Sequence, residues 1–397
     1  MSRLLSLLYF SNSLVRGGAE EHILTLLRGL DRTLFRPHLA CTPEVAEQLR
    51  ADLPGDVGLT TLRLRSPRHG REARRLAGLL RSRQVDILHS HLFYASLFAS
   101  PLGLLCRVPC IVETPHVREH WRHGWLKGGF TVDRLVARCV DHFIAVSEAN
   151  ARYLVERKRI PARKITVIRN GCDTARFDPR REPPPTLRSN LCFGAEDPVL
   201  VVLGRLEPQK GHAILLEALP SVVEQFPGVR VVCLGEGSLR RELEIRATAL
   251  GLERTVRFVG FQADVAQWLA LGVLTVLPSL WEGLPLAAIE SLAAGRPMVA
   301  TAVDGTPEVV VEGRTGLTVP PGDPQALARA ICRLLADREE RQRMATAGRA
   351  WVLEHFDQQG QVRLTQELYR TAFVPVASAV GRSSQGAPRP SAASERR

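Results

Sequence analysis

The sequence predicts an α/β protein of two doubly wound domains, each built on a parallel sheet. Its 397 residues exceed what one typical core accommodates. Short apolar runs alternate with segments long enough for helices, which is typical of parallel strands covered on both faces. A proline-dense stretch at residues 177–187 divides these runs into two series. Because prolines disfavour a helix interior, we interpret that stretch as an extended linker.

The expected strands fall into two sets. In the first half they are residues 4–10, 38–42, 60–64, 85–89, 110–114, 143–147 and 165–168. In the second half they are residues 199–203, 230–234, 256–259, 274–277, 298–301 and 317–319. We therefore predict an N-terminal domain over residues 1–180 and a C-terminal domain over 195–355. Residues 375–397 are rich in Ala, Ser, Gly, Arg and Pro without apolar periodicity, so we expect a disordered tail.

The net charge of +12 is unevenly distributed. Residues 1–181 contain 30 Lys and Arg against 17 Asp and Glu, whereas residues 182–374 contain 19 against 23. The basic half could contact anionic lipid, an anionic glycan or nucleic acid. Alternatively, the arginines only solvate the surface of an Arg-rich chain.

Several features bear on location. The eight cysteines are scattered, and we interpret them as reduced, buried thiols of a cytosolic protein. The apolar start runs into Asn12, Arg16, Gly17 and Gly18 without a cleavage pattern, so we expect no signal peptide. The longest uncharged stretch, residues 92–106, contains Pro101 and is too short to span a bilayer. We expect a cytoplasmic protein, with the inner face of the membrane as a candidate place of work.

The stretch from Ser279 to Gly295 is the most informative for function. It places Glu282 and Glu290 eight positions apart, with Gly283, Leu284 and a proline between them. If the segment were helical, eight residues would rise about 12 Å, roughly the length of a sugar–diphosphate–ribose unit. Two carboxylates could then hold hydroxyls at the ends of that ligand, with a helix N-terminus between them for the phosphates.

Other groups follow the carboxyl ends of the expected strands, where parallel sheets bind ligands. Arg205 and Lys210 flank a turn before Gly211 and suit a diphosphate. Gly17 and Gly18 follow the first strand and allow close backbone approach to a phosphate or sugar; an ordinary strand-to-helix turn is the alternative. Glu236 lies in Gly235–Gly237, a Gly-x-Gly that is weak evidence alone.

We predict no resident metal and no cofactor. The sequence contains no Gly-Lys-Ser/Thr phosphate loop and no Asp-x-Asp pair for a Mg²⁺–diphosphate. Charge neutralisation would come from Arg205, Lys210 and a helix dipole. His116, His120 and His123 raise a metal cluster as an alternative. Trp121 and Trp125 beside them favour a membrane or acceptor surface, or an ordinary exposed loop. His89 and His91 end another run and are expected to pack or to line the cleft.

In this order and spacing, the motifs resemble those of the retaining GT-B glycosyltransferases of the family 4 type. The resemblance covers about residues 1–372. It includes Gly17-Gly18-Ala-Glu, His116, 146–148, 170–173, 204–211, 235–237, 258–260 and the pair Glu282 and Glu290. The segment 356–372 is similar to the family's last helix, which returns to the first domain. One departure is Asp304-Gly305-Thr306, where the family often has two glycines.

The resemblance implies a GT-B fold of two facing Rossmann-like domains and a role for each residue. Arg205 and Lys210 would bind the donor diphosphate, and Glu290 the ribose hydroxyls. Glu282 would hold sugar hydroxyls, with backbone N–H groups near Gly283 and Leu284. Gly17 and Gly18 would approach the donor from the other domain, with His116 near the transferred sugar and Glu236 at the nucleotide.

We therefore expect transfer of a hexose or N-acetylhexosamine from a nucleotide sugar, with a UDP-sugar favoured, to a lipid-linked or cell-surface glycan. Peripheral membrane contact would come from the basic N-terminal domain, and no nucleic-acid partner is expected. The alternatives are a GT-B epimerase or phosphorylase, and a non-catalytic protein that binds membrane or nucleic acid.

Overall fold

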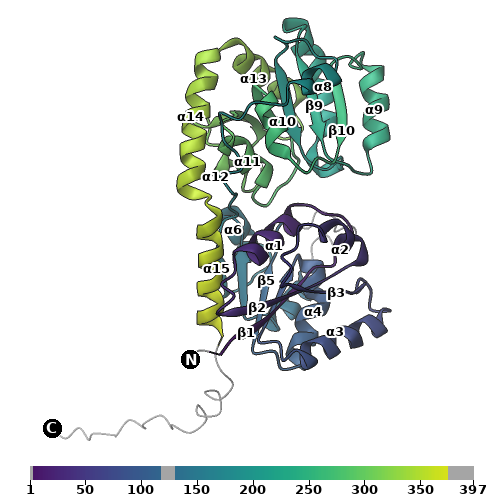
Figure 1. The fold of residues 1–397 in the computed structure, drawn as a ribbon, viewed down its shortest axis with the longest axis vertical. Coiled ribbons are helices and arrows are strands. Elements are labelled where there is room, and N and C mark those ends of the chain that lie inside the picture. Colours follow the sequence, from purple (N-terminus) through teal and green to yellow (C-terminus); the bar gives the residue numbers. More distant parts are fainter. Residues whose placement is uncertain (1–2, 118–129, 374–397) are drawn as a thin grey trace, which may run out of the picture.

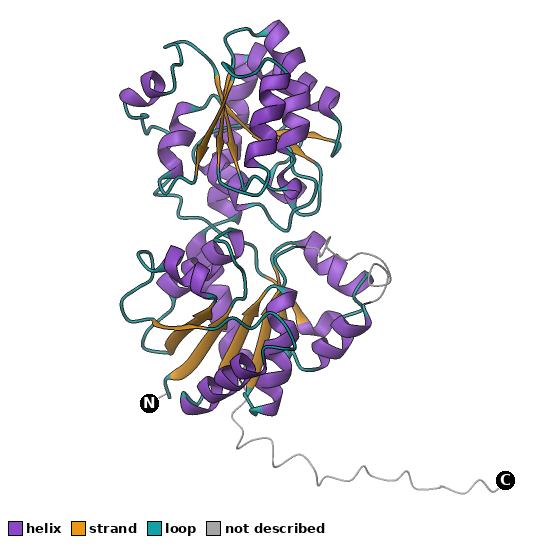
Figure 2. Cartoon of the chain, turned by 90° about the vertical axis from the view of Figure 1, so that its right-hand side faces the viewer, coloured by secondary structure: helices purple, strands orange, loops and turns teal. Residues whose placement is uncertain are grey.

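The computed structural model describes residues 3–117 and 130–373, and its two parallel sheets confirm the predicted fold class. One sheet has the strand order β3-β2-β1-β4-β5-β6-β7, and the other β10-β9-β8-β11-β12-β13. Both orders reverse beside the first strand of their domain, which is the doubly wound arrangement. Figure 1 shows the two domains stacked end to end, and Figure 2 shows helices on both sides of each sheet.

The strands of the N-terminal sheet are β1 (Leu5–Phe10), β2 (Phe35–Cys41), β3 (Gly58–Thr61), β4 (Ile87–His91), β5 (Cys110–Thr114), β6 (His142–Ala145) and β7 (Ile165–Val167). Those of the C-terminal sheet are β8 (Val199–Leu203), β9 (Arg230–Leu234), β10 (Val256–Gly260), β11 (Leu274–Leu277), β12 (Met298–Thr301) and β13 (Gly316–Val319). Each expected run overlaps one strand. The central strands β4, β5 and β8 are buried at every position, because helices cover both faces of the sheets.

The helices of the N-terminal half are α1 (Gly18–Gly29), α2 (Pro43–Leu49), α3 (Gly70–Ser82), α4 (Phe93–Leu105), α5 (Thr131–Arg138) and α6 (Glu148–Glu156). After α7 (Thr186–Asn190), the C-terminal half contains α8 (His212–Gln225), α9 (Arg240–Ala249), α10 (Val265–Leu271), α11 (Leu286–Ala293), α12 (Thr306–Val309), α13 (Pro324–Ala336) and α14 (Arg338–His355). Within the described residues, 3₁₀ turns span Ala162–Lys164 and Pro208–Lys210.

The last helix, α15 (Gln358–Ala372), returns to the N-terminal domain, as Figure 1 shows in yellow. It packs beside α1, and its Val362, Leu368 and Tyr369 belong to the core between α1 and β1. The chain therefore crosses between the domains twice. The two crossings lie side by side, joined by a parallel bridge between Cys172 and Asp357.

Two sequence-based expectations lie outside the described residues: the disordered tail at 375–397 and the segment with Trp121 and Trp125. All eight cysteines are free thiols, but they are not all buried: Cys192 is exposed, and Cys106 and Cys139 are half-buried. Among the described residues, no helix combines the length and the apolar character needed to cross a bilayer.

Candidate functional site

A cavity of about 500 Å³ lies between the two domains, beyond the carboxyl ends of β1, β4, β5 and β8. Its lining residues come from the loops that follow β1, β3, β4, β5, β7, β8 and β11, and from the first two turns of α1 and α11. They include Ser13, Gly17, Gly18, Glu20, Arg65, His116, Asn170, Arg205, Gln209, Lys210, Glu282, Gly283, Leu284 and Glu290. The strand-end rule used for the sequence therefore locates the site.

Lys210 reaches the cavity from a tight turn between β8 and α8. The turn ends at Gly211, whose φ of 64° lies in the left-handed region that favours glycine. A Cβ at this position would lie 1.9 Å from the Pro278 carbonyl oxygen, so only glycine allows the turn to pack this closely. Arg205, just after β8, is exposed, and its guanidinium lies 3.5 Å from the Gln209 side-chain oxygen.

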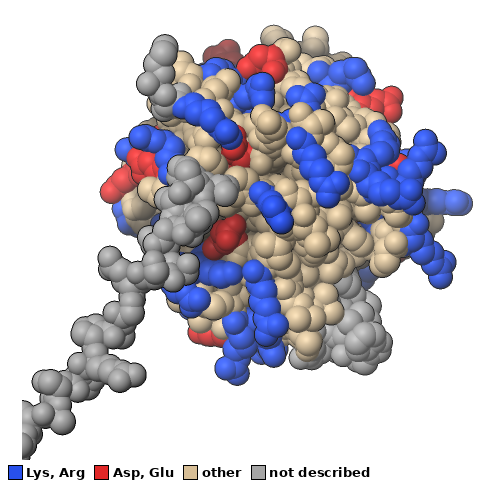
Figure 3. Space-filling view, turned by 90° about the horizontal axis from the view of Figure 1, so that it is seen from below, with Lys and Arg blue, Asp and Glu red and all other residues tan. Residues whose placement is uncertain are grey.

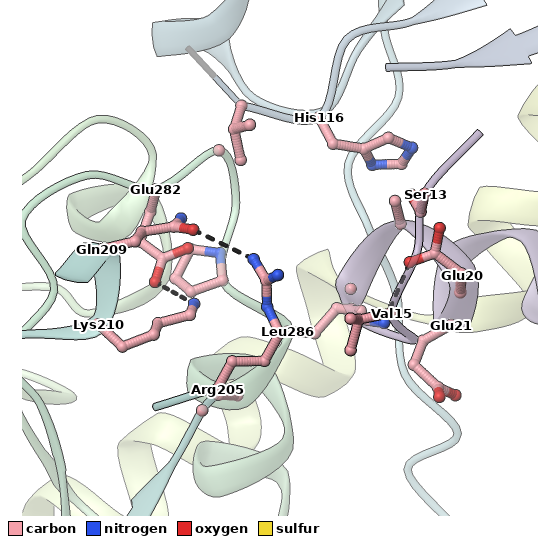
Figure 4. Close-up of a pocket in the computed structure, with 18 of the residues that line it drawn as sticks. Ser13, Val15, Glu20, Glu21, His116, Arg205, Gln209, Lys210, Glu282 and Leu286 are labelled. Carbon is pink, nitrogen blue, oxygen red and sulfur yellow. Dashed lines mark hydrogen bonds and ion pairs between the residues drawn. The ribbon is translucent and has the colours of Figure 1, made fainter. Parts of the chain in front are cut away.

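Glu282 and Lys210 form an ion pair, with Lys210 Nζ 2.5 Å from Glu282 Oε1 (Figure 4). Ser279 Oγ donates to the same carboxylate oxygen at 2.7 Å, and the Glu282 side chain is 5% exposed. The backbone N–H of Glu282 donates to Asp304 Oδ2 at 2.9 Å. The resemblance assigned Lys210 to the diphosphate and Glu282 to the sugar. Their contact shows that the two side chains given these roles adjoin.

Only the second part of the Glu282–Glu290 segment is helical, because α11 begins at Leu286, directly after Pro285. The continuous helix considered from the sequence is therefore wrong. The cavity instead meets an irregular loop followed by the N-terminus of α11. Glu290 lies in the second turn of α11, where burial, aided by the charge of Glu21, raises its pKa to about 7.

The N-terminal domain presents the first turn of α1 to the cations. The N–H of Gly17 donates to Glu20 Oε2 at 3.0 Å, and a Cβ on Gly17 would lie 3.7 Å from Arg205 Nε. Figure 4 shows Arg205 extending between the Lys210–Glu282 pair and the start of α1. The N-termini of α1 and α11 therefore both face the cavity, and their dipoles favour an anion there.

His116 follows β5 and packs against the loop that contains Glu282 and Gly283. A Cβ on Gly283 would lie 1.6 Å from the His116 carbonyl oxygen, so glycine is required where the two domains touch. Burial lowers the pKa of His116 well below its usual value, and the nearby His22 and His89 add to this effect. The imidazole is therefore neutral at pH 7.

The structure brings the predicted site residues to one cavity, except for Glu236. That side chain is 55% exposed, is not among the cavity-lining residues, and pairs with Arg240 at 2.8 Å. Sequence reasoning gave no role to six polar lining side chains: Ser13, Glu20, Glu21, Arg65, Asn170 and Gln209. Gln209 and Asn170 lie inside motifs already quoted, so their positions carried a signal. Ser13 and Arg65 carried none.

One group of described residues could hold a metal ion. His22, His91 and His116 are buried together, and each offers a nitrogen within 4.8 Å of the others. This group differs from the His116, His120 and His123 cluster considered from the sequence. His89 lies beside it with both ring nitrogens hydrogen-bonded, to the Tyr369 hydroxyl at 2.5 Å and to Thr114 Oγ1 at 2.7 Å.

Two stretches of the chain match known families. Residues 16–176 match Glycosyltransferase Family 4, and residues 185–351 match Glycosyl transferases group 1. Glycogen synthase of Mycobacterium tuberculosis is 33% identical over 304 residues, covering 74% of this chain and 71% of that protein. The chain therefore belongs to the family 4 type of glycosyltransferase.

Other relatives of this glycosyltransferase have different names. A D-inositol 3-phosphate glycosyltransferase of Nocardioides sp. is 30% identical over 324 residues, covering 74% of this chain and 69% of the relative. Anabaena HepE in complex with UDP-glucose is a structural neighbour, with a TM-score of 0.80 at 22% identity. The alignment covers 92% of this chain and 100% of HepE, and it supports the GT-B fold.

Proposed function

We propose that this glycosyltransferase transfers a hexose or N-acetylhexosamine from a nucleotide-diphosphate sugar to a glycan hydroxyl, with retention at the anomeric carbon. The observation that carries the proposal is the cavity itself. It combines Arg205 and Lys210, two helix N-termini, and a carboxylate at each end of the segment from Glu282 to Glu290. Cations and helix dipoles suit the diphosphate, while acceptor-only carboxylates suit sugar and ribose hydroxyls.

Charge develops during transfer mainly on the leaving diphosphate. As the anomeric bond breaks, Arg205, Lys210 and the start of α11 would stabilise that negative charge where it grows. The leaving phosphate would take the proton of the acceptor hydroxyl, so the residues need not supply a strong base. Neutral His116 would approach the transferred sugar from the other domain. Contact between the two domains would exclude water and limit hydrolysis.

Glu282 acts in this mechanism as a binder and not as a nucleophile. Its carboxylate is already engaged by Lys210 and Ser279, which lowers its readiness to attack a carbon. The Lys210 charge is shared between Glu282 and the diphosphate, so the ion pair would hold the ammonium in place beside the leaving group. This assembly supplies the neutralising charge from side chains, and we propose that transfer requires no metal ion.

A UDP-sugar is the favoured donor. The structural neighbour HepE was solved with UDP and with UDP-glucose, and an Escherichia coli relative is named as a UDP-Gal-dependent galactosyltransferase. That relative is 26% identical over 266 residues and acts, by its name, on a diphosphoundecaprenol-linked sugar. These names favour a lipid-linked or cell-surface glycan as the acceptor.

The donor experiment measures transfer and donor stability separately. The protein is incubated with UDP-glucose, UDP-galactose, UDP-N-acetylglucosamine or GDP-mannose, each with and without a polyprenyl-diphosphate-linked sugar. We expect an α-linked product only when acceptor is present, and unchanged activity in EDTA. A new sugar isomer formed from donor alone would instead identify an epimerase, and phosphate-dependent cleavage a phosphorylase.

The basic N-terminal domain is the proposed membrane-facing part. Figure 3 shows that Lys and Arg outnumber Asp and Glu on the end of the molecule formed by this domain. Helix α3 at this end exposes Arg71, Arg74 and Arg81. Anionic headgroups attract such clusters by about 1 kcal/mol per charge. We expect the protein to sediment with phosphatidylglycerol vesicles, and Arg71→Glu with Arg74→Glu to reduce that fraction. Equal sedimentation with phosphatidylcholine vesicles would refute the proposal.

A further inference from the structure

Three histidines from distant parts of the sequence meet beneath the cavity. His22 lies on α1, His91 ends β4, and His116 follows β5. Their exposed fractions are 2%, 0% and 7%. His116 lines the cavity, whereas His22 and His91 lie behind it. The proposed transfer mechanism uses only His116, so the other two need a separate explanation.

The hydrogen bonding of these rings is incomplete. Among the described residues, His22 Nε2 and His91 Nε2 have no hydrogen-bond partner although both atoms are buried. A buried polar atom without a partner costs about 1–3 kcal/mol, so two such atoms in one cluster are unusual. A ligand that accepts nitrogen lone pairs would remove at least part of that cost.

The surroundings of His22 allow the tautomer that a metal needs. His22 Nδ1 lies 2.9 Å from Asn170 Oδ1, while Asn170 Nδ2 donates to the Leu284 carbonyl oxygen at 3.1 Å. Gln361 Nε2 also lies 3.0 Å from His22 Nδ1, so Nδ1 can either accept from Gln361 or donate to Asn170, and donation to Asn170 leaves the Nε2 lone pair free. Metal-binding histidines usually donate their other ring N–H to such an oxygen.

The spacing of the three rings fits one tetrahedral metal ion. Their centroids are 4.8 Å apart for His22 and His116, 5.3 Å for His91 and His116, and 5.4 Å for His22 and His91. Three imidazoles on one zinc ion, with Zn–N bonds of about 2.0 Å, have centroids roughly 5 Å apart. His91 Nδ1 and His116 Nε2 are hydrogen-bonded to each other at 3.0 Å, close to the separation of two ligands on such an ion, and a bound metal would replace this hydrogen bond.

We infer that His22, His91 and His116 form a binding site for a divalent transition metal, with Zn²⁺ as the best-suited ion. Three neutral imidazoles are a recognised ligand set for zinc with a fourth position left open. His116 faces the cavity, so that fourth position would be taken by water or by a hydroxyl of a bound sugar. The site goes beyond the proposed function, because transfer needs no metal. Occupancy would hold His116 toward His22 and His91 and inhibit transfer.

The binding experiment uses Co²⁺ as a spectroscopic substitute for Zn²⁺ on the full-length, chelator-treated protein. One equivalent of Co²⁺ should give the intense visible absorption of tetrahedral cobalt, and Zn²⁺ should displace it. His22→Gln and His91→Gln should each weaken binding by at least about 100-fold, because losing an outer-shell partner alone costs 10–100-fold. His212→Gln is the matched control: His212 is buried, and neither ring nitrogen has a partner among the described residues, but it stands alone in the other domain.

Two outcomes would overturn the inference. The first is the absence of a tetrahedral cobalt spectrum in the wild type. The second is a spectrum that persists in both His22→Gln and His91→Gln, which would place the ion elsewhere. If those variants unfold, X-ray absorption of the zinc-loaded wild type still counts the imidazoles; three support the site and fewer refute it. None of these readouts depends on sugar transfer, so they stand or fall separately from the proposed function.

Inhibition is measured as the ratio of transfer rates with and without Zn²⁺ at one equivalent. We expect the ratio to fall in the wild type and in His212→Gln, and to stay near one in His91→Gln. A wild-type rate unaffected by bound zinc would refute the inhibitory role.

Discussion

The raised pKa of Glu290 predicts that donor binding depends on pH. Desolvation by burial, aided by the charge of Glu21, raises this pKa to about 7. In the proposed role of Glu290, ribose hydroxyls would donate to the ionised carboxylate, in which both oxygens accept hydrogen bonds. Donor binding therefore requires the charged form, whereas the unliganded protein at pH 7 holds a mixture of both forms. In the protein molecules whose Glu290 is protonated, donor binding must displace that proton.

The expected size of the effect follows from that pKa. About one tenth of Glu290 is ionised at pH 6 and about nine tenths at pH 8, so the donor should bind roughly tenfold more tightly at pH 8. This corresponds to about 1.4 kcal/mol. At pH 7 binding should release roughly half a proton. UDP-glucose is the suitable ligand, because its diphosphate is esterified at both ends and does not titrate in this range.

Isothermal calorimetry at pH 6, 7 and 8, in two buffers of different ionisation enthalpy, measures both the affinity and the released proton. Glu290→Gln should bind more weakly and lose the pH dependence. Glu21→Gln removes one cause of the raised pKa and should shift the midpoint to lower pH. Affinity that is flat from pH 6 to 8 in the wild type, or equally steep in Glu290→Gln, would refute the role of Glu290.

The same shift affects folding stability. Because the pKa of Glu290 rises from 4.5 to about 7 on folding, the folded protein binds the proton more tightly than the unfolded chain. The resulting stability is present below pH 4.5 and is lost as pH rises through about 7, by up to about 3 kcal/mol. Thermal unfolding of the unliganded protein should show this loss, and Glu290→Gln should show less of it.

Further substitutions test other parts of the structure. Lys210→Ala should lower turnover by tens- to a thousand-fold, as loss of one charge-stabilising group does, and wild-type kinetics at saturating donor would rule out its phosphate role. Gly283→Ala should lower turnover and loosen the domain contact, because its Cβ would overlap the His116 carbonyl oxygen; small-angle scattering measures the domain separation. Lys158 is 1% exposed and pairs with Asp133 at 3.0 Å. Lys158→Met should unfold at a higher temperature than Lys158→Ala, because Met keeps the packing of the apolar stem. Equal unfolding midpoints for the two variants would show that packing of the stem adds nothing.

The fold could be predicted because its strands are continuous apolar runs. The strand at Cys110–Thr114 was placed at its observed bounds, since a proline flanks it on each side. The observed bounds differ from the predicted ones where a strand end carries polar or proline residues. The strand Phe35–Cys41 begins before its predicted start, because Arg36 and Pro37 interrupt the apolar run. The proline before Leu286 marked the start of α11 but also meant that the preceding loop is not helical.

The site was predictable where its residues belong to motifs beside strand ends. Arg205, Lys210 and Glu282 gather because their strands are neighbours in one sheet. The histidine cluster was not predictable, because it needs α1 packed over β4 and β5. Glu236 was misleading because its Gly-x-Gly context indicates a turn without saying where the side chain points; an arginine one helical turn later binds it instead.

The bridge between Cys172 and Asp357 has a consequence for how the enzyme opens. Two connections that run together act as one pivot, so the domains would rotate about that line rather than move apart in parallel. Displacement grows with distance from a pivot. Asn170 lies only two residues from Cys172, so it would move little. Glu290 is close enough for its charge to raise the pKa of the Cys172 thiol, a shift that burial mainly causes. The nucleoside end of the donor would therefore stay nearly assembled, while the far edge of the cavity admits and releases sugars.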